Sequence, residues 1–370
     1  MSKAAELAAL IGSQTALSNR NIVINGAMQV AQRGDVTGIT GESYGGPDRF
    51  ELNASSIGTF TISQSSTAPT GFKNSWKVDC TTADASPASG DLLRVSYRIE
   101  GQDLQQLAYG TSGAKAITLS FYVRSNKTGT YNVQFQQIDN SFKQAVLSYT
   151  IDSADTWEFK SITVPGDTSG LINDDNGDGL ALFWLLGAGS TFTSGSERST
   201  YTAFANGDVA PTQTVNLADN TANEWLITGV QLEVGEQATP FEHEPYSATL
   251  RKAQRYHYRR DITIYDVAAM GGVNSTNRGA YLLNIPTAMR AKPACSQGSN
   301  IHCWYSAVGQ VTTQSNLVVV YMDNDATEFN QVYIMADANS TLASVGHPLA
   351  LTSYHSSGLA DSHISLDAEL

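Results

Sequence analysis

The chain has 370 residues, of which 41% are hydrophobic and only 15% are charged, and its formal net charge is −13. Average soluble domains carry roughly 25% charged residues, so neutral polar side chains must fill much of this surface. A nucleic-acid binder needs clustered Lys and Arg to displace counterions from phosphates, and an anionic membrane repels an acidic surface. The densest basic run, residues 251–260, is interrupted by aromatic residues. We therefore expect neither nucleic acid nor membrane insertion.

The first residues, Met-Ser-Lys-Ala-Ala-Glu, lack the apolar core of a signal peptide. We therefore expect the protein to be made and folded in a cytoplasm. Its three cysteines, Cys80, Cys295 and Cys303, match no zinc-binding spacing. We expect them to stay reduced and to serve as small apolar side chains.

The N-terminal segment, residues 1–20, is expected to be an attachment segment that contains a helix. Residues 3–12 are predicted to form a short helix, with Gly12 as its stop. A helix this short is marginal alone, so its apolar stripe must cover its own domain or bundle with the stripes of other copies. We expect this face to meet symmetry mates or a docking protein. The stripe consists of Ala4, Leu7, Leu10 and Ile11.

From about residue 21 the hydrophobic period becomes two, as in half-buried antiparallel strands. The clearest examples are residues 93–99, 117–124 and 131–136, where apolar residues alternate with polar ones. Turn signals rich in Gly, Pro, Asn and Asp separate the strands. Many short strands without a convincing central helix predict a β-sandwich, and two packed sheets of this size predict a jelly roll.

Two segments add detail to this sandwich. Residues 180–186 form a continuous apolar run, which predicts a strand buried on both faces. Gly229 interrupts the alternation between Trp225 and Val234, which indicates a β-bulge. Four tryptophans in strand-like contexts are expected in the core, namely Trp76, Trp157, Trp184 and Trp225.

The predicted fold is therefore all-β. We expect a jelly-roll β-sandwich over residues 21–246, a short helix or irregular connector over 247–260, and a smaller C-terminal β domain over 261–370. At roughly 110 residues, the last unit has the size of a small domain. Its clearest strands are predicted at 281–285, 317–322 and 331–335.

Exposed aromatic rings are natural contacts for a saccharide, because a flat ring stacks on the apolar face of a sugar. In the C-terminal domain, one aromatic pair follows the start of a strand, and another sits in a loop rich in Ser, Thr and Gly. These rings could instead fill a small trimeric core. The candidate glycan-binding residues are Trp304, Tyr305, Tyr354 and His355.

Residues 174–179 place acidic or amide oxygens at every second position and end in Gly, as at the opening of a calcium loop. The closing glutamate of such a loop is missing, since Leu185 occupies its position. A polar hairpin turn is the favoured interpretation, and calcium held by Asp174, Asn176 and Asp178 is the alternative. No other cofactor is expected.

Catalytic motifs are not evident. Ser194-Gly195-Ser196 lacks the strand–turn–helix context of a nucleophile elbow, and the histidines form no HExxH motif. A pair such as Glu242 and Glu244 could hydrolyse a glycoside only if the carboxylates faced each other across a cleft. A solvated loop is the favoured interpretation of that pair. We expect the chain not to be an enzyme.

Two long motifs frame the predicted sandwich. Residues 21–34 read NIVINGAMQVAQRG, and residues 229–242 read GVQLEVGEQATPFE. They resemble the N-x-x-I-N-G-x-M-x-V-x-Q-R-G and G-x-Q-L-E-x-G-x-x-A-T-P-F-E motifs of a widespread family of phage and prophage virion proteins. Shorter matches lie at residues 45–50, 121–125, 149–151, 254–256 and 366–370. The resemblance covers about residues 21–260 and is weaker from 261 onward.

The resemblance implies a carbohydrate-binding-module-like β-sandwich in a tail fibre, tail spike or head fibre of a tailed phage, usually a homotrimer, and brings no catalytic residue. We expect a structural virion protein, a fibre or spike that contacts host-surface glycans through residues 261–370 and joins other virion proteins through its N-terminus. The alternative is a purely structural head fibre, decoration, collar or adaptor protein without glycan binding. The third reading is a polysaccharide depolymerase, and the repeat of a parallel β-helix, which such enzymes often use, is not seen in the sequence.

Overall fold

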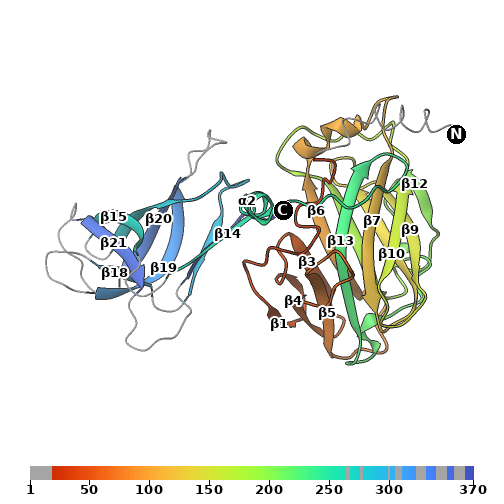
Figure 1. The fold of residues 1–370 in the computed structure, drawn as a ribbon, viewed down its shortest axis with the longest axis horizontal. Helices are drawn as coiled ribbons and strands as arrows, with labels where there is room; N and C mark the ends of the chain where they lie inside the picture. The colour runs from red at the N-terminus through yellow and green to blue at the C-terminus, as the bar shows by residue number, and fades with distance from the viewer. Residues whose placement is uncertain are drawn as a thin grey trace. The chain divides into compact units, whose positions relative to one another are not determined.

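The computed structural model describes residues 19–262, 267–275, 278–298, 301–304, 311–321, 331–338, 348–353 and 363–370. The chain forms two compact units, Met1–Thr249 together with Leu370, and Leu250–Glu369. Both are mostly β, as the hydrophobic period of two predicts (Figure 1). Within the part of the chain that the structure describes, no helix is long and apolar enough to cross a membrane.

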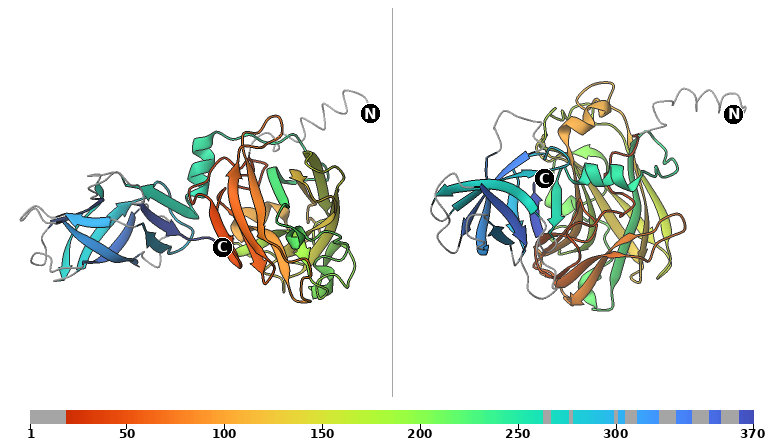
Figure 2. Two further views of the ribbon diagram at one scale, coloured as in Figure 1. Left: turned by 90° about the horizontal axis from the view of Figure 1, so that it is seen from below. Right: turned by 60° about the vertical axis from the view of Figure 1, so that its left-hand side comes forward.

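The first unit is a sandwich of two antiparallel sheets (Figures 1 and 2), which confirms the predicted fold class. One sheet has six strands in the order β1 (Val36–Ile39), β4 (Thr59–Ser65), β5 (Ser75–Thr82), β13 (Glu224–Val234), β7 (Ile117–Ser125) and β10 (Glu158–Val164). The other has seven strands in the order β12 (Arg198–Thr202), β9 (Gln144–Ile151), β8 (Gly129–Gln137), β11 (Asp178–Ala188), β6 (Leu92–Glu100), β3 (Phe50–Ser55) and β2 (Glu42–Tyr44). A 3-10 helix, η2 (Gly101–Leu107), follows β6.

The core lies between the two sheets, because alternation points every second side chain inward. The ring centroid of Phe50 lies 5.9 Å from that of Trp76 and 6.4 Å from that of Trp184. Both tryptophans and Trp225 are fully buried, as predicted. The prediction for Trp157 is wrong, because this residue precedes β10 outside any strand and is only half-buried.

Strand β11 is buried on both faces over residues 180–186, as its continuous apolar run predicts. Alternate side chains, beginning with Leu180, face the core between the sheets. The others, including Phe183, pack against Val209 and Ala210 on the outer side. The segment between β11 and β13 therefore covers part of the outer face of the seven-stranded sheet. It contains β12 and two 3-10 helices, η3 (Asn206–Asp208) and η4 (Leu217–Asp219).

This cover changes the expected surface of β8. The alternation over residues 131–136 predicts a half-buried strand, yet its polar residues Asn132 and Gln134 are buried as well. Asn132 Nδ2 donates to Thr212 Oγ1 at 2.9 Å, and Gln134 Nε2 donates to Gln144 Oε1 at 2.6 Å. Hydrogen bonds to the covering segment and to β9 replace those to water for both amide nitrogens, whereas Gln134 Oε1 is buried without a hydrogen-bond partner among the described residues.

The β-bulge predicted at Gly229 is confirmed. The register between β13 and β7 shifts between Thr228 and Gln231, and Gly229 has a φ of +62°. A Cβ at this position would lie 2.7 Å from Cζ of Phe72. The backbone conformation and the close ring both require glycine here.

The second unit contains a three-stranded sheet and a closed barrel. The sheet runs β14 (His257–Asp261), β22 (His363–Asp367) and β17 (Ala294–Gln297). The barrel runs β15 (Val267–Ser275), β16 (Arg278–Asn284), β20 (Gln331–Ala338), β19 (Val311–Tyr321), β18 (Ile301–Trp304) and β21 (Pro348–Ser353). Before the barrel in the sequence, α2 (Tyr246–Ala253) and the first residues of β14 occupy residues 247–260, which were expected to be a short helix or irregular connector.

Candidate functional site

Most sequence-predicted site residues lie outside the described residues. This holds for the stripe Ala4, Leu7, Leu10 and Ile11, and for Tyr305, Tyr354 and His355. Trp304 ends β18, where its backbone is in register with Val311 and Ala350, but its side chain is not described. Their proposed roles in docking and glycan binding stay predictions.

The segment predicted as a polar turn or calcium loop leads into β11. Asp178 Oδ2 accepts a hydrogen bond from Arg98 Nη1 at 2.5 Å, so its charge is already met by a cation. Asp175 Oδ1 accepts one from the backbone N–H of Gly177 at 2.8 Å, as in a polar turn. Among the described residues, no group of three His, Cys, Asp or Glu side chains could hold a metal ion. This geometry favours the turn, and calcium stays a prediction.

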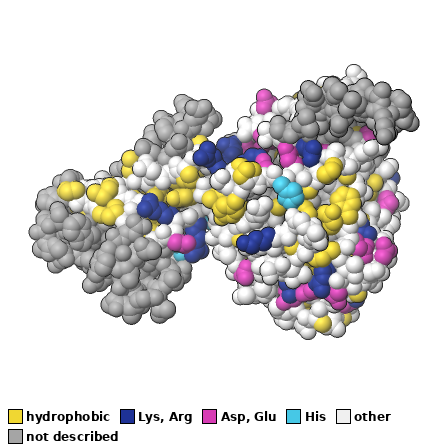
Figure 3. Space-filling view, viewed as in Figure 1, with side chains coloured by type: hydrophobic (Ala, Val, Ile, Leu, Met, Phe, Trp, Pro, Cys, Tyr) yellow, Lys and Arg dark blue, Asp and Glu magenta, His cyan; other side chains and the backbone are white. Residues whose placement is uncertain are grey.

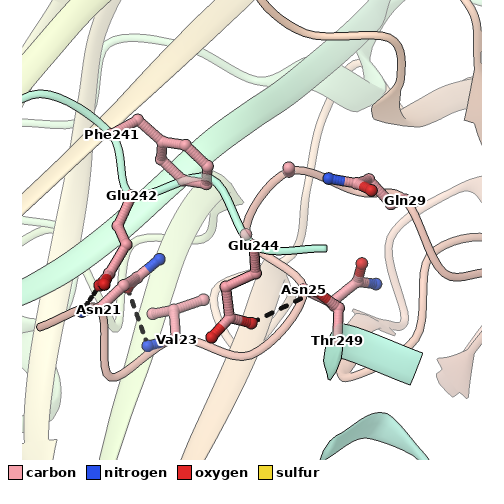
Figure 4. A pocket seen from close by; sticks show the side chains of 10 residues that line it. Asn21, Val23, Asn25, Gln29, Phe241, Glu242, Glu244 and Thr249 are labelled. Atoms are coloured by element: carbon pink, nitrogen blue, oxygen red, sulfur yellow. Dashed lines mark hydrogen bonds between the residues drawn. The ribbon is translucent and has the colours of Figure 1, made fainter. Parts of the chain in front are cut away.

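A hollow beside the N-terminal strap, residues 19–30, is lined by both long sequence motifs (Figure 4). Glu242 lies at its edge and accepts three backbone hydrogen bonds from the strap, from Asn19, Arg20 and Asn21 at 2.7, 2.8 and 2.9 Å. Glu242 lies in an irregular, partly exposed segment, as expected of a loop, but its carboxylate accepts from backbone donors instead of facing only solvent. These three contacts give the carboxylate a structural role in holding the strap.

Asn21 fastens the same strap to β13. Its Oδ1 accepts from the backbone N–H groups of Val23 and Leu232 at 3.0 and 3.1 Å, and its Nδ2 donates to the carbonyl of Val230 at 3.1 Å. A Cβ on Gly26 would lie only 2.0 Å from that same carbonyl oxygen. The strap can therefore approach β13 this closely only with glycine at position 26.

The second motif completes this clasp, which we define as Asn21, Gly26, Gln231, Glu233, Thr239 and Glu242. Gln231 Oε1 accepts from the backbone N–H of Glu242 at 2.8 Å. Glu233 accepts from the backbone N–H and hydroxyl of Thr239 at 2.8 and 2.7 Å. Motifs about 200 residues apart in sequence thus hold one another in place, and their polar residues have structural roles.

A charged row occupies the outer face of the seven-stranded sheet, beside the covering segment. We define it as Glu51 on β3, Arg94 and Arg98 on β6, and Asp178 on β11. The Arg94 guanidinium lies over the buried ring of Phe183, 4.2 Å from its centroid. The side chains of Arg98 and Asp178 are 24% and 14% exposed, so this part of the row is accessible to solvent. Both residues lie on strands, which fix their positions.

Several polar atoms of this row are buried without a partner. Arg94 Nε, Arg98 Nε and Asp178 Oδ1 have no hydrogen-bond partner in the described part of the chain. Burial lowers the pKa of Arg94, and the nearby charge of Arg98 adds to this effect. Burial also raises the pKa of Glu51, which Arg98 offsets only in part. Perturbed charges with unsatisfied polar atoms are typical of binding sites.

The outer face of the six-stranded sheet carries aromatic rings instead. We define the aromatic platform as Phe72, Tyr122, Phe159, Phe241 and His243. Ring centroids are 5.0 Å apart for Phe241 and Phe72, 5.5 Å for Phe72 and Tyr122, and 5.2 Å for Tyr122 and Phe159. Figure 3 shows hydrophobic side chains beside a histidine over this sheet. Sequence reasoning missed both features, because their residues come from several distant segments.

The sandwich is similar in structure to carbohydrate-binding modules and to a domain of a phage tailspike. A family 11 carbohydrate-binding module from Clostridium thermocellum, in complex with a β-1,3-1,4-mixed-linked tetrasaccharide, is 11% identical with a TM-score of 0.28, over 56% of this chain and 98% of that one. The C-terminal family 22 carbohydrate-binding module of Xyn10B from the same organism is 10% identical with a TM-score of 0.29, over 57% and 99%.

The enzymatically active domain of tailspike protein 4 from bacteriophage CBA120 is 10% identical, with a TM-score of 0.31 over 58% of this chain. The match spans only 22% of that tailspike chain. No protein-family model matches the sequence, and no curated protein sequence matches it.

Proposed function

We propose that this chain is a structural virion protein of a tailed phage, a fibre or spike that binds a host-surface glycan without cleaving it. The observation that carries this proposal is the charged row on the seven-stranded sheet. Sugar hydroxyls both donate and accept hydrogen bonds, so they need both kinds of partner in fixed positions. Arg94 and Arg98 supply donors, and Glu51 and Asp178 supply acceptors, all on rigid strands.

The stacked guanidinium of Arg94 is the centre of this proposed site. The Phe183 ring beneath it fixes the plane of the guanidinium, so little side-chain freedom is lost on binding. The partly exposed side chains of Arg98 and Asp178 open this row to solvent. The virion assignment rests on the two sequence motifs, whose residues form the clasp rather than a catalytic site.

A screen of the purified full chain against bacterial surface polysaccharides tests the proposal. We expect binding to at least one polysaccharide, and Arg94→Ala should weaken it by an order of magnitude or more, since a charged hydrogen bond contributes about 1.5–3 kcal/mol. Arg124→Ala is the matched control, because Arg124 also points outward from a strand, on the other sheet. Equal losses in both variants would contradict a site on the charged row.

Two further outcomes separate this function from its alternatives. The bound polysaccharide should keep its chain length after long incubation, because the proposal includes no hydrolysis; shortening would favour a depolymerase. A purely structural head fibre, decoration, collar or adaptor protein would bind none of the polysaccharides. The full chain should be a homotrimer by light scattering at micromolar concentration, and a monomer mass would contradict the expected assembly.

A further inference from the structure

The aromatic platform is a surface that the proposed glycan site does not use. Its rings come from the turn before β5, from β7 and β10, and from the segment after β13, so the fold brings them together from distant parts of the sequence. Phe159 is 51% exposed. His243 is also exposed, and Phe72, Tyr122 and Phe241 are half-buried. Neighbouring rings that stay partly open to solvent on one face of a sheet commonly mark a docking surface.

The N-terminal segment joins the described structure beside this platform. The backbone N–H of Asn19 donates to Glu242 Oε1 at 2.7 Å. Glu242 lies between Phe241 and His243 in the sequence, and both of these are platform rings. Asn19, the first described residue, therefore lies at the edge of the platform.

We propose that residues 3–12 dock on the aromatic platform of their own chain through the stripe Ala4, Leu7, Leu10 and Ile11. The stripe and the platform are two apolar surfaces joined by a short piece of chain. A ten-residue helix is marginal in water without a surface to pack on. Tethering gives the stripe a high effective concentration at the platform, so even a modest apolar contact suffices.

The dimensions of the two surfaces fit this docking. The linker of residues 12–18 spans at most about 23 Å when extended, which exceeds the three centroid steps from Phe241 to Phe159. A helix over residues 3–12 is about 15 Å long. Its length therefore matches the row of rings, whose successive centroids are 5.0, 5.5 and 5.2 Å apart.

Hydroxyl-radical footprinting of the full chain tests this docking independently of glycan binding. We expect Tyr122 and Phe159 to be oxidised several-fold faster in the Leu7→Asp/Leu10→Asp variant than in the unmodified chain. Ala5→Asp/Ala9→Asp is the matched control, because positions 5 and 9 lie on the opposite side of the predicted helix. It should keep the original protection. Phe142, which is 52% exposed in the turn after β8, should react equally in all three proteins.

Three results would overturn the proposal. The first is equal oxidation of Phe159 in the unmodified chain and in the stripe variant. The second is equal loss of protection in both variants, which would make helix formation rather than the stripe responsible. The third is protection that disappears on dilution, which would mean that residues 3–12 of a neighbouring copy protect the platform. Loss of glycan binding by Arg94→Ala affects none of these readouts, so the two proposals fail separately.

Discussion

The two outer faces of the sandwich differ, although the same alternation of residues builds both sheets. The six-stranded sheet presents aromatic rings such as Phe159, which is 51% exposed. The seven-stranded sheet presents charged side chains and is partly covered by the segment between β11 and β13. Alternation decides which residues point away from the core, but the connecting segments decide whether those residues meet water or protein.

Charges on the two faces also have different surroundings. Glu224, on the six-stranded sheet, pairs with Lys77 at 2.6 Å and with Arg124 at 2.5 Å. Burial alone would raise the pKa of Glu224, but these two cations lower it overall. Burial raises the pKa of Glu51 on the other face, where Arg98 only partly offsets it. Glu224 is thus stabilised in its ionised form by two cations. Glu51 is stabilised less by its neighbours, so it binds a proton or a hydrogen-bond donor of a ligand more readily.

The largest expected effect concerns the core that both faces share. Trp184→Ala should reduce the free energy of unfolding by about 3–5 kcal/mol, because it removes buried apolar surface and leaves a cavity. Trp157→Ala is the matched control, since Trp157 is only half-buried, and it should have a much smaller effect. Chemical denaturation of both variants measures the difference. Similar losses for the two tryptophans would show that burial does not separate them.

An intermediate effect is expected at the clasp. Glu242→Ala leaves three backbone N–H groups of the strap without their acceptor, so we expect a loss of about 1–3 kcal/mol. Glu236→Ala changes an exposed glutamate in the same segment and should have little effect. Hydrogen exchange should also show faster opening of residues 19–23 in the first variant. Unchanged exchange there would contradict the clasp.

The smallest effect is a difference in the pH dependence of the two faces. The folded-state pKa of Glu224 is lowered, so its carboxylate stabilises the fold above the unfolded pKa of about 4.3, and this stability is lost as pH falls through the folded pKa. The folded-state pKa of Glu51 is raised, so its ionisation destabilises the fold as pH rises through that value.

Substitution by glutamine should therefore act in opposite directions. On going from acidic to neutral pH, Glu224→Gln should lose stability relative to the unmodified protein, whereas Glu51→Gln should gain it. Denaturation midpoints measured between about pH 2.5 and pH 7 give both trends, since this range extends well below and above the unfolded pKa of about 4.3. Parallel trends for the two variants would mean that the faces do not differ in this way.

Sequence periodicity predicted the parts of the fold that depend on one strand at a time. The apolar run at 180–186 and the bulge at Gly229 were both confirmed, because each reflects a local requirement for burial or backbone conformation. The predicted burial of Trp157 was wrong, because this residue lies between strands, where the alternation of apolar and polar residues does not indicate which side chains are buried. The buried polar residues of β8 were also missed, because their cover comes from a distant segment.

The candidate site was harder to predict for the same reason. Arg94 and Arg98 are recognisable in the sequence only as the polar partners of an alternating strand. Their importance depends on Phe183 and Asp178, which β11 brings alongside β6. Glu242 was expected in a solvated loop, although the backbone donors it accepts from lie more than 200 residues away. Pairings of this kind become visible only when strand order and register are known.

Competition for phage adsorption tests the central claim most directly, because it also compares the two units of the chain. Under the proposed virion role, purified full chain added to host cells should block adsorption of the phage. Arg94→Ala should lose this activity, whereas Trp304→Ala and Tyr354→Ala should retain it if the glycan binds the charged row of the sandwich. Full blocking by Arg94→Ala, with loss in the Trp304 and Tyr354 variants, would contradict the account and place the receptor site in the C-terminal unit.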